Sequence, residues 1–284
     1  MDTYVKGRFY YGIKTGLNKA FVIDRAARDR LIREDRKSAD LIKPWIRGKD
    51  IKRWTHEFHE LYVIIVRYGF HTELKKYPAI LRHLSTFEVK LKARGQCKTS
   101  RSGASEGQHH WLELDNNPSS EFLSLFNNDR IVLPIIKKTH GFSFVEGGSC
   151  SNDKTTFFIS PEAHFLLAVM NSSTIEWLVR MEFPGLGDPW AGGRIEYRAA
   201  NVKRLPIPSA SASDKSRLTK LADRATNLTV AGGGAALAKV EQEIDAIVFR
   251  LFELTSDEIV QIETSLANTR AASSDDDDDT GEDA

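Results

Sequence analysis

Two short stretches hold residues whose types and spacing could support metal-dependent chemistry. Glu88-Val-Lys90 has the Glu-x-Lys spacing with which a carboxylate and a lysine position a metal-bound water in nucleases. It lies within a helical pattern and has no obvious partner aspartate, which favours a solvated helix face. His56 and His59 have helical ligand spacing, but a metal site usually needs a third ligand from elsewhere, and none is indicated. We therefore predict no metal site in this chain.

The glycine-containing loops do not have the sequence context that a cofactor requires. Gly12-Ile-Lys-Thr15 lacks the upstream glycine and the Gly-Lys pair of a phosphate-binding loop. Gly232-Gly-Gly234 lies between predicted helices and does not follow a strand, so we interpret it as a hinge. A DNA adenine methyltransferase needs an Asn/Asp-Pro-Pro-aromatic loop to hold the flipped base, whereas Asn117-Pro118 is followed by Ser119. The sequence predicts no catalytic residue and no cofactor bound by this chain.

Clustered basic residues indicate a different chemistry, which is contact with a polyanion. Residues 43–53 carry five bases against one acid, Asp50, and Trp45 and Trp54 accompany them. Basic residues interleaved with aromatic ones suit a surface that follows phosphates. The alternative is that both tryptophans belong to the core and the cations only solvate a turn.

A second basic segment, residues 92–110, is also rich in glycine and serine. Such a donor-rich loop suits the reading of base edges, because arginine pairs with guanine and glutamine with adenine. A disordered surface loop is the competing interpretation. The predicted DNA-contacting residues are Lys14, Asn18, Lys19, Arg47, Lys49, Lys52, Arg53, Arg94, Gln96, Lys98, Arg101, Gln108, Lys137, Lys138 and Arg194, of which Gln96, Arg101 and Gln108 would read bases.

The elements that would position these residues form a mixed α/β domain over residues 1–208. A turn at Thr15-Gly16, where glycine allows positive φ, leaves Lys14, Asn18 and Lys19 at a loop tip between two strands. β-Branched and aromatic residues bounded by turn formers predict strands at 8–13, 20–24, 61–66, 131–136, 142–145 and 155–159. Apolar spacing and capping residues predict helices at 77–93, 161–171 and 173–182, followed by a loop at 183–195.

After a Pro- and Ser-rich linker the pattern becomes purely helical. Leu237, Val240, Ile244, Ile247 and Leu251 step by three and four, as in a heptad seam. Residues 209–270 are therefore predicted to form a coiled-coil-like helical hairpin, which docks on the first domain or on a partner. Residues 271–284 are predicted to be a disordered acidic tail.

The composition is that of an ordinary folded protein with an uneven charge distribution. The chain has 284 residues, of which 41% are hydrophobic and 28% charged. Its net charge of +1 conceals seven acids after residue 274, without which 40 bases face 32 acids. A basic body suits a polyanion partner, although a surface that merely favours Lys and Arg is an equal alternative. No apolar run approaches the ~20 residues of a membrane helix, and no signal peptide is evident, so we expect a cytoplasmic protein without membrane contact.

Eight segments occur in an order that is typical of one known module. They are 12–24, 41–54, 77–94, 111–114, 130–134, 166–172, 205–208 and 243–259. In this order they resemble the TaqI-like C-terminal specificity domain, the target-recognition part of type IIG restriction–modification proteins and BREX-type adenine methyltransferases. The resemblance covers roughly residues 8 to 262. It implies a module that binds double-stranded DNA in a restriction–modification or phage-defence system.

The resemblance also implies which functions lie on other chains. Adenine would be modified by a methyltransferase, or a methyltransferase–nuclease, that carries S-adenosylmethionine and, in the latter case, Mg²⁺. The helical hairpin would attach the module to this partner, or to a second copy in a homodimer. The family carries the module behind a methyltransferase domain, whereas Met1 lies a few residues before it here. A split subunit, a truncated gene and an excised domain are all open interpretations.

Two other function classes stay open. A protein-binding adaptor or inhibitor could mimic a specificity subunit, and its acidic tail would then imitate the charge of DNA. It would bind the partner protein and ignore DNA, whereas a DNA reader should bind duplexes less tightly as salt rises. A nuclease that acts alone is the third hypothesis, which incubation with plasmid and Mg²⁺ would test.

Overall fold

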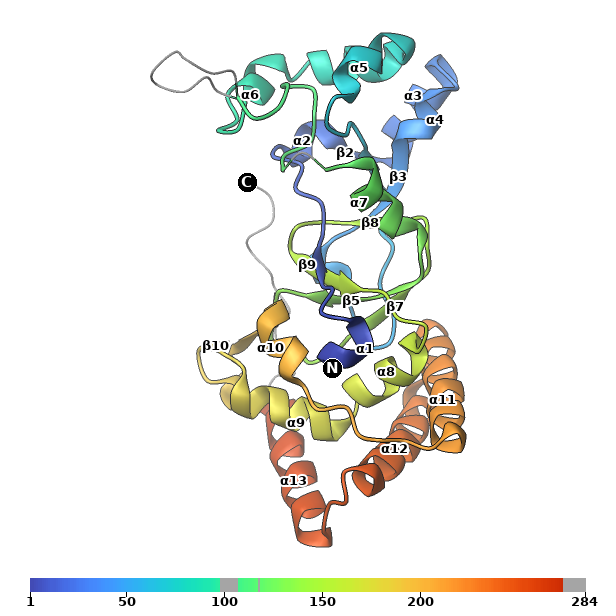
Figure 1. Cartoon of the computed structure of the whole chain (residues 1–284), viewed down its shortest axis with the longest axis vertical. Coiled ribbons are helices and arrows are strands. Elements are labelled where there is room, and N and C mark those ends of the chain that lie inside the picture. Colours follow the sequence, from blue (N-terminus) through green and yellow to red (C-terminus); the bar gives the residue numbers. More distant parts are fainter. Residues whose placement is uncertain (98–106, 117, 273–284) are drawn as a thin grey trace.

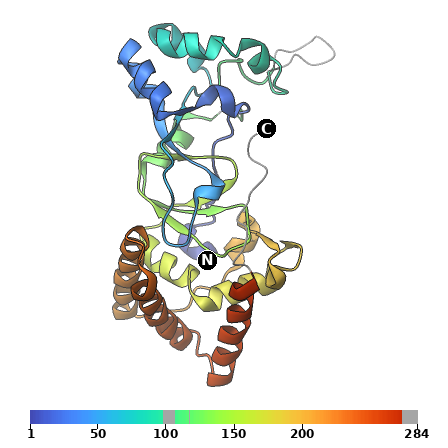
Figure 2. The same ribbon diagram turned by 180° about the vertical axis from the view of Figure 1, so that it is seen from behind.

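The computed structural model describes residues 1–97, 107–116 and 118–272, which form three small sheets surrounded by helices (Figure 1). The molecule is elongated, and its longest helices gather at one end (Figures 1 and 2). These helices are α11 (Ala212–Val230), α12 (Gly234–Leu251) and α13 (Ser256–Ala272). A mixed α/β body followed by a helical region confirms the predicted fold class. The predicted acidic tail lies beyond the described residues.

The central sheet is buried on both of its faces. It joins, in spatial order, β1 (Tyr10–Tyr11), β9 (Thr155–Phe158), β5 (Arg130–Pro134) and β7 (Ser143–Val145). Ile131 and Leu133 of β5 lie in one hydrophobic cluster, whereas Val132 lies in the other. Phe158 and Phe157 of β9 divide in the same way. Because successive side chains of a strand point to opposite faces, this sheet contributes side chains to a separate hydrophobic core on each of its faces.

The first core lies between the central sheet and a second, mostly antiparallel sheet. Its strands, in spatial order, are β2 (Val22–Asp24), β4 (Leu61–Ile64), β3 (Ile42–Ile46) and β8 (Cys150–Ser151). Short helices surround it: α2 (Asn18–Phe21), α3 (Arg25–Glu34), α4 (Ser38–Leu41), α5 (Pro78–Ser85), α6 (Glu88–Lys92), α7 (Ser120–Ser124), η1 (Gly48–Asp50), η2 (Phe70–Lys76) and η3 (Leu125–Asn127).

The second core lies on the other face of the central sheet and is mainly helical. Its helices include α1 (Asp2–Val5), α8 (Ala163–Met170), α9 (Ser173–Glu182) and α10 (Ala199–Arg204). A third sheet, with order β10-β11-β6, borders this core. Its elements are β10 (Gly185–Leu186), η4 (Pro189–Ala191), β11 (Arg194–Glu196) and β6 (Ile136–Lys137).

The helical hairpin packs on its own body. Val240, Ile244 and Ile247 of the predicted heptad seam are buried in the same hydrophobic cluster as Ile131 of β5. Helix α11 packs against both α12 and α8. Of the two predicted alternatives, the structure shows the hairpin docked on its own first domain. The apolar seam of α12 packs against α8 and α9 as well as α11. The domain boundary at residue 208 stays a prediction.

Several predicted elements differ from those observed. The helix expected at 77–93 is two helices, because the chain breaks at Thr86 and Phe87. The strand expected at 20–24 begins only at Val22, since one helical turn, α2, precedes it. The expected loop 183–195 contains the β10–β11 hairpin, and α3 was not predicted. Helix α3 agrees with the helix propensity of its Ala, Arg and Leu residues and with its Asp24 cap, so a local signal was missed there, whereas strand pairing determines the conformation of the β10–β11 hairpin.

His140 lies in the second core, where both of its ring nitrogens face neutral oxygen atoms. Its Nε2 lies 2.7 Å from the Met170 carbonyl oxygen and its Nδ1 lies 3.2 Å from the Tyr197 hydroxyl. Burial lowers the pKa of His140 to about 4, because the charged ring would lose its hydration. The same cause lowers the pKa of His56 and His83. The native state therefore favours the neutral form of these three histidines.

We expect the free energy of unfolding to fall as the pH is lowered from about 6.5 to about 4. In this window the unfolded chain binds a proton that native His140 does not, so acid favours unfolding, by up to about 3 kcal/mol from this residue. Urea unfolding at a series of pH values should show this loss, and His140→Gln should reduce its slope. The exposed His59→Gln should retain the slope of the unsubstituted protein; equal slopes for all three proteins would contradict the assignment.

Candidate nucleic-acid interface

Backbone hydrogen bonds bring five segments that are distant in sequence to one surface. The turn at 151–155 is the centre: the Ile13 N–H donates to the Ser151 carbonyl (2.7 Å), and the Asn152 N–H donates to the Ile46 carbonyl (3.0 Å). The Ile135 N–H donates to the Lys154 carbonyl (2.8 Å). Strand β6 then pairs with β11. These bonds align 12–19, 46–52, 151–155, 135–138 and 194–196 side by side.

Two glycines are required where the first of these segments meets its neighbours. A Cβ on Gly12 would lie 1.8 Å from the Asn152 carbonyl oxygen, so the two backbones approach too closely for any side chain. Gly16 has φ +74° and faces the Asp115 carboxylate, as the predicted turn demands. The role of segment 12–16 is therefore structural: its two glycines allow the backbone to pack closely against Asn152 and Asp115 at this surface.

Basic side chains follow the aligned segments, and we call this set the basic strip. Lys14, Lys19 and Lys154 are exposed, while the others are partly exposed. Two of the acids beside them are paired with arginines, Asp50 with Arg47 (2.7 Å) and Asp115 with Arg94 (3.1 Å), while Asp153 is partly exposed next to Lys154. Its members are Lys14, Lys19, Lys49, Lys138, Lys154 and Arg194.

The structure places the predicted cations of residues 43–53 in different environments. Trp45 and Trp54 are only 2% and 1% exposed, so both belong to the cores and the interleaved aromatic surface was wrongly predicted. Arg47 holds the buried Asp50 at the start of η1. Lys49 and Lys52 are partly exposed, and Lys52 lies 3.9 Å from Glu57.

Arg53 was predicted to contact DNA, but the structure assigns it to a buried cluster. Its guanidinium pairs with Glu176 of α9 (3.0 Å) and with Glu241 of α12 (2.8 Å). The indole Nε1 of Trp54 donates to the same Glu241 (2.7 Å). The two carboxylates raise the pKa of Arg53 against the opposing effect of burial. Arg53 therefore connects the loop after η1 to helices α9 and α12. We remove it from the predicted DNA-contacting residues.

Arg94 is likewise interior, which corrects its predicted DNA contact. It is 7% exposed, and it donates to the carbonyls of Thr15, Leu91, Trp111 and Glu113 and to the Asp115 carboxylate. These acceptors belong to the first turn and to the two ends of the 92–110 segment. The Arg94 guanidinium thus connects the two ends of the 92–110 segment, which we call the loop stem, to the turn at Thr15.

The predicted base readers are only partly described by the structure. The Gln96 side chain bonds to Asn116 through both its amide nitrogen (3.0 Å) and its oxygen, so it also fastens the loop stem. Gln108 is exposed. Lys98 and Arg101 lie outside the described residues. Base readout by this segment therefore stays a prediction.

The remaining predicted contacts lie along the basic strip. Asn18 is exposed, and its Oδ1 accepts from the Thr15 hydroxyl at the start of α2. Lys14 lies 3.8 Å from Asp115, while Lys137 points inward and donates to the Ile51 carbonyl. Lys154 was missed from the sequence, although the turn formers Asn152 and Asp153 before it were a usable signal.

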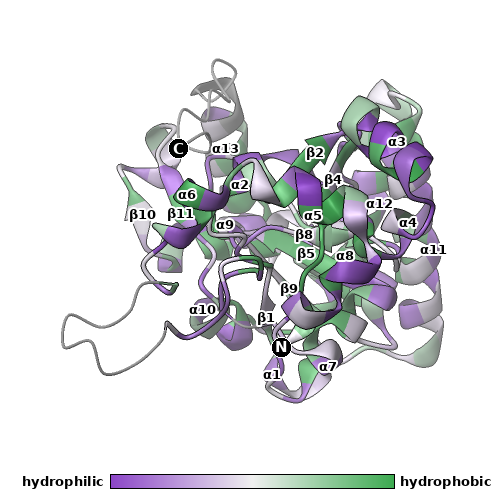
Figure 3. Cartoon of the chain, turned by 90° about the horizontal axis from the view of Figure 1, so that it is seen from above, coloured by the Kyte–Doolittle hydropathy of each residue, from purple (hydrophilic) through white to green (hydrophobic). Residues whose placement is uncertain are grey.

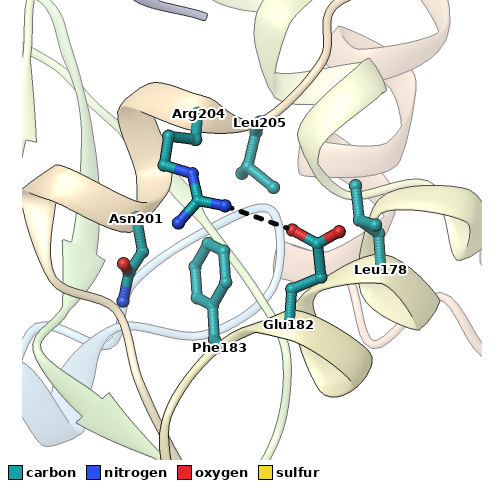
Figure 4. Close-up of a pocket in the computed structure, with 6 residues that line it drawn as sticks. All are labelled: Leu178, Glu182, Phe183, Asn201, Arg204 and Leu205. Atoms are coloured by element: carbon teal, nitrogen blue, oxygen red, sulfur yellow. Dashed lines mark ion pairs between the residues drawn. The ribbon is translucent and has the colours of Figure 1, made fainter.

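Potential metal ligands, thiols and a pocket occur in the part of the chain that the structure describes. Within residues 1–97, 107–116 and 118–272, no group of three or more His, Cys, Asp or Glu side chains could hold a metal ion. Burial raises the pKa of the Cys150 thiol to about 12. A small, shallow pocket lies between α9 and α10, where Arg204 points toward Glu182 (Figure 4). In the same part of the chain, no helix has the length and apolarity to span a membrane.

Comparison with known proteins finds a similar fold among solved structures. No family model and no curated protein matches the sequence. Among solved structures, the chain is similar to the type IIL restriction–modification enzyme MmeI, solved in complex with DNA, with a TM-score of 0.62 and 12% identity. The match covers 94% of this chain and 35% of the enzyme, so the chain spans about a third of that protein. The chain therefore has a restriction–modification-related fold, and the narrower TaqI-like resemblance stays an interpretation.

We expect Arg94→Met to lower the free energy of unfolding by about 3–5 kcal/mol, because it leaves buried carbonyls and a buried carboxylate without their donor. Lys154→Ala removes an exposed cation and should stay within about 0.5 kcal/mol of the unsubstituted protein. Urea unfolding of the three proteins measures both changes. Similar stabilities for both variants would return Arg94 to the DNA-contact set.

Proposed function

We propose that this chain is the DNA-recognition part of a restriction–modification system. The observation that carries the proposal is the similarity of almost the whole chain to one segment of an enzyme that was solved with DNA. The basic strip supports it independently, because its cations come from five segments and two of the acids beside it, Asp50 and Asp115, pair with arginines. Such a surface suits phosphates of a duplex, which set the register of a protein on DNA.

In the finer proposal, the chain is a specificity module that performs no reaction alone. An adenine-specific methyltransferase partner would supply S-adenosylmethionine and the catalytic loop, and a nuclease partner would supply any Mg²⁺. The exposed faces of α11 and α13 are the surfaces through which a partner or a second copy would attach, since their inner faces pack on the body. Incubation of the chain with plasmid and Mg²⁺ should leave the plasmid intact.

Salt dependence tests the proposed phosphate contacts. We expect the unsubstituted chain to bind a short mixed-sequence duplex, and the logarithm of the association constant to fall linearly with the logarithm of the salt concentration. The double variant Lys49→Ala/Lys154→Ala should weaken binding and reduce this slope by about 2, which is about one unit for each lost phosphate contact. Fluorescence anisotropy over a salt series gives both quantities.

Arg33→Ala/Arg36→Ala is the matched control, because it also removes two exposed cations, at the end of α3 and just after it, and α3 lies on the opposite side of the molecule from α6 and β10 (Figures 1 and 3). It should retain the slope. An absence of duplex binding at low salt would contradict the proposed function and favour a protein-binding adaptor. Equal loss from the Arg33/Arg36 and strip variants would instead mean that net charge alone drives binding.

A further inference from the structure

The third sheet presents apolar side chains to solvent beside the basic strip. Leu186 of β10 is 52% exposed, and Ile136 of β6 is 41% exposed. The strand register places Leu186 opposite Arg194, and Ile136 opposite Glu196. Residues that are directly opposite in paired strands share a face, and Arg194 and Glu196 are two positions apart. All four side chains therefore lie on one outer face.

The other face of this sheet is turned to the body. Ile195 is fully buried, and the amino group of Lys137 donates to the Ile51 carbonyl. The outer face has a positive balance, because Glu196 pairs with Arg198 (2.6 Å) while Arg194 and Lys138 border Leu186 and Ile136. The sheet is thus an anchored platform with an apolar and cationic outer surface.

The hairpin that carries Leu186 is held in a defined conformation. Buried Arg180 donates to the Pro189 carbonyl (2.7 Å), and the Asp188 side chain accepts from the Trp190 N–H (2.9 Å). The Gly193 N–H closes the loop onto the Asp188 carbonyl (2.7 Å). Helix α13 packs on η4 from behind. An exposed leucine on a fastened hairpin loses little conformational freedom when it binds.

We propose that Leu186 is an apolar wedge that inserts at a base step of duplex DNA, with Arg194 on a flanking phosphate. The proposal rests on the proposed function and deepens it. Proteins that deform DNA insert leucine or similar side chains between base pairs and hold the neighbouring phosphates with cations. Two observations favour DNA as the occupant: the cations beside Leu186, and the continuity of β6 with the turn at 151–155 in the basic strip.

Base unstacking provides the test. A set of duplexes that carry 2-aminopurine at successive positions should gain fluorescence at one or more positions when the unsubstituted chain binds. Leu186→Ala should abolish this gain and weaken binding about tenfold, since apolar burial is lost while phosphate contacts stay. Leu186→Met should retain the gain, because methionine fills a similar volume. Tyr68→Ala, at a 56% exposed position between β4 and η2, is the control and should change neither quantity.

The outcomes separate the wedge from the function it rests on. Duplex binding without any fluorescence gain, or with a gain that Leu186→Ala retains, would overturn the wedge and leave DNA recognition standing. A Leu186→Ala variant that loses self-association in sedimentation and keeps its DNA affinity would overturn it in favour of a protein contact. If the unsubstituted chain binds no duplex, the proposed function fails first. Because Leu186 is exposed, its variants should unfold at the same urea concentration as the parent.

Discussion

The rest of the structure depends on the burial of both faces of the central sheet. Alternate residues of β5 and β9 belong to different cores, so neither core can form without the pairing of these strands. The turn between β8 and β9 leaves the sheet at its edge, where it meets the first motif of the chain and the segment before η1. The turn that carries Lys154 is therefore anchored directly to the central sheet, and its backbone hydrogen bonds attach the neighbouring segments of the basic strip to it.

Buried and exposed cations have separate roles in this arrangement. Arg53 and Arg94 act inside, where each one joins segments that are far apart in sequence and satisfies carboxylates that would otherwise be costly to bury. Lys49, Lys154 and Arg194 lie at the surface, where under the proposed function they would contact phosphates. Such contacts fix register only when the segments that carry them are held in place, which is what the buried arginines do.

Much of this fold could be predicted from local patterns, whereas the candidate site could be predicted only in part. The runs around 131–136 and 155–159 are apolar and β-branched, so their strands were evident, and the spacing of Val240, Ile244 and Ile247 gave the helical hairpin. Sequence does not reveal partners, however. Arg53 meets Glu176 across 123 positions, and Trp54 meets Glu241 across 187. Arg53 was therefore predicted to lie at the surface, because the carboxylates that pair with it belong to helices that are distant in sequence.

Hydrogen–deuterium exchange of the full chain, measured with and without duplex DNA, shows whether the basic strip and the third sheet contact DNA. We expect DNA to slow exchange in peptides from 12–19, 46–52, 135–138, 151–155 and 185–196. Peptides of α3 and of the outer helices α11 and α13 should exchange as they do without DNA. Protection confined to α3 or to the C-terminal helices, or no protection at DNA concentrations that saturate binding, would contradict this expectation.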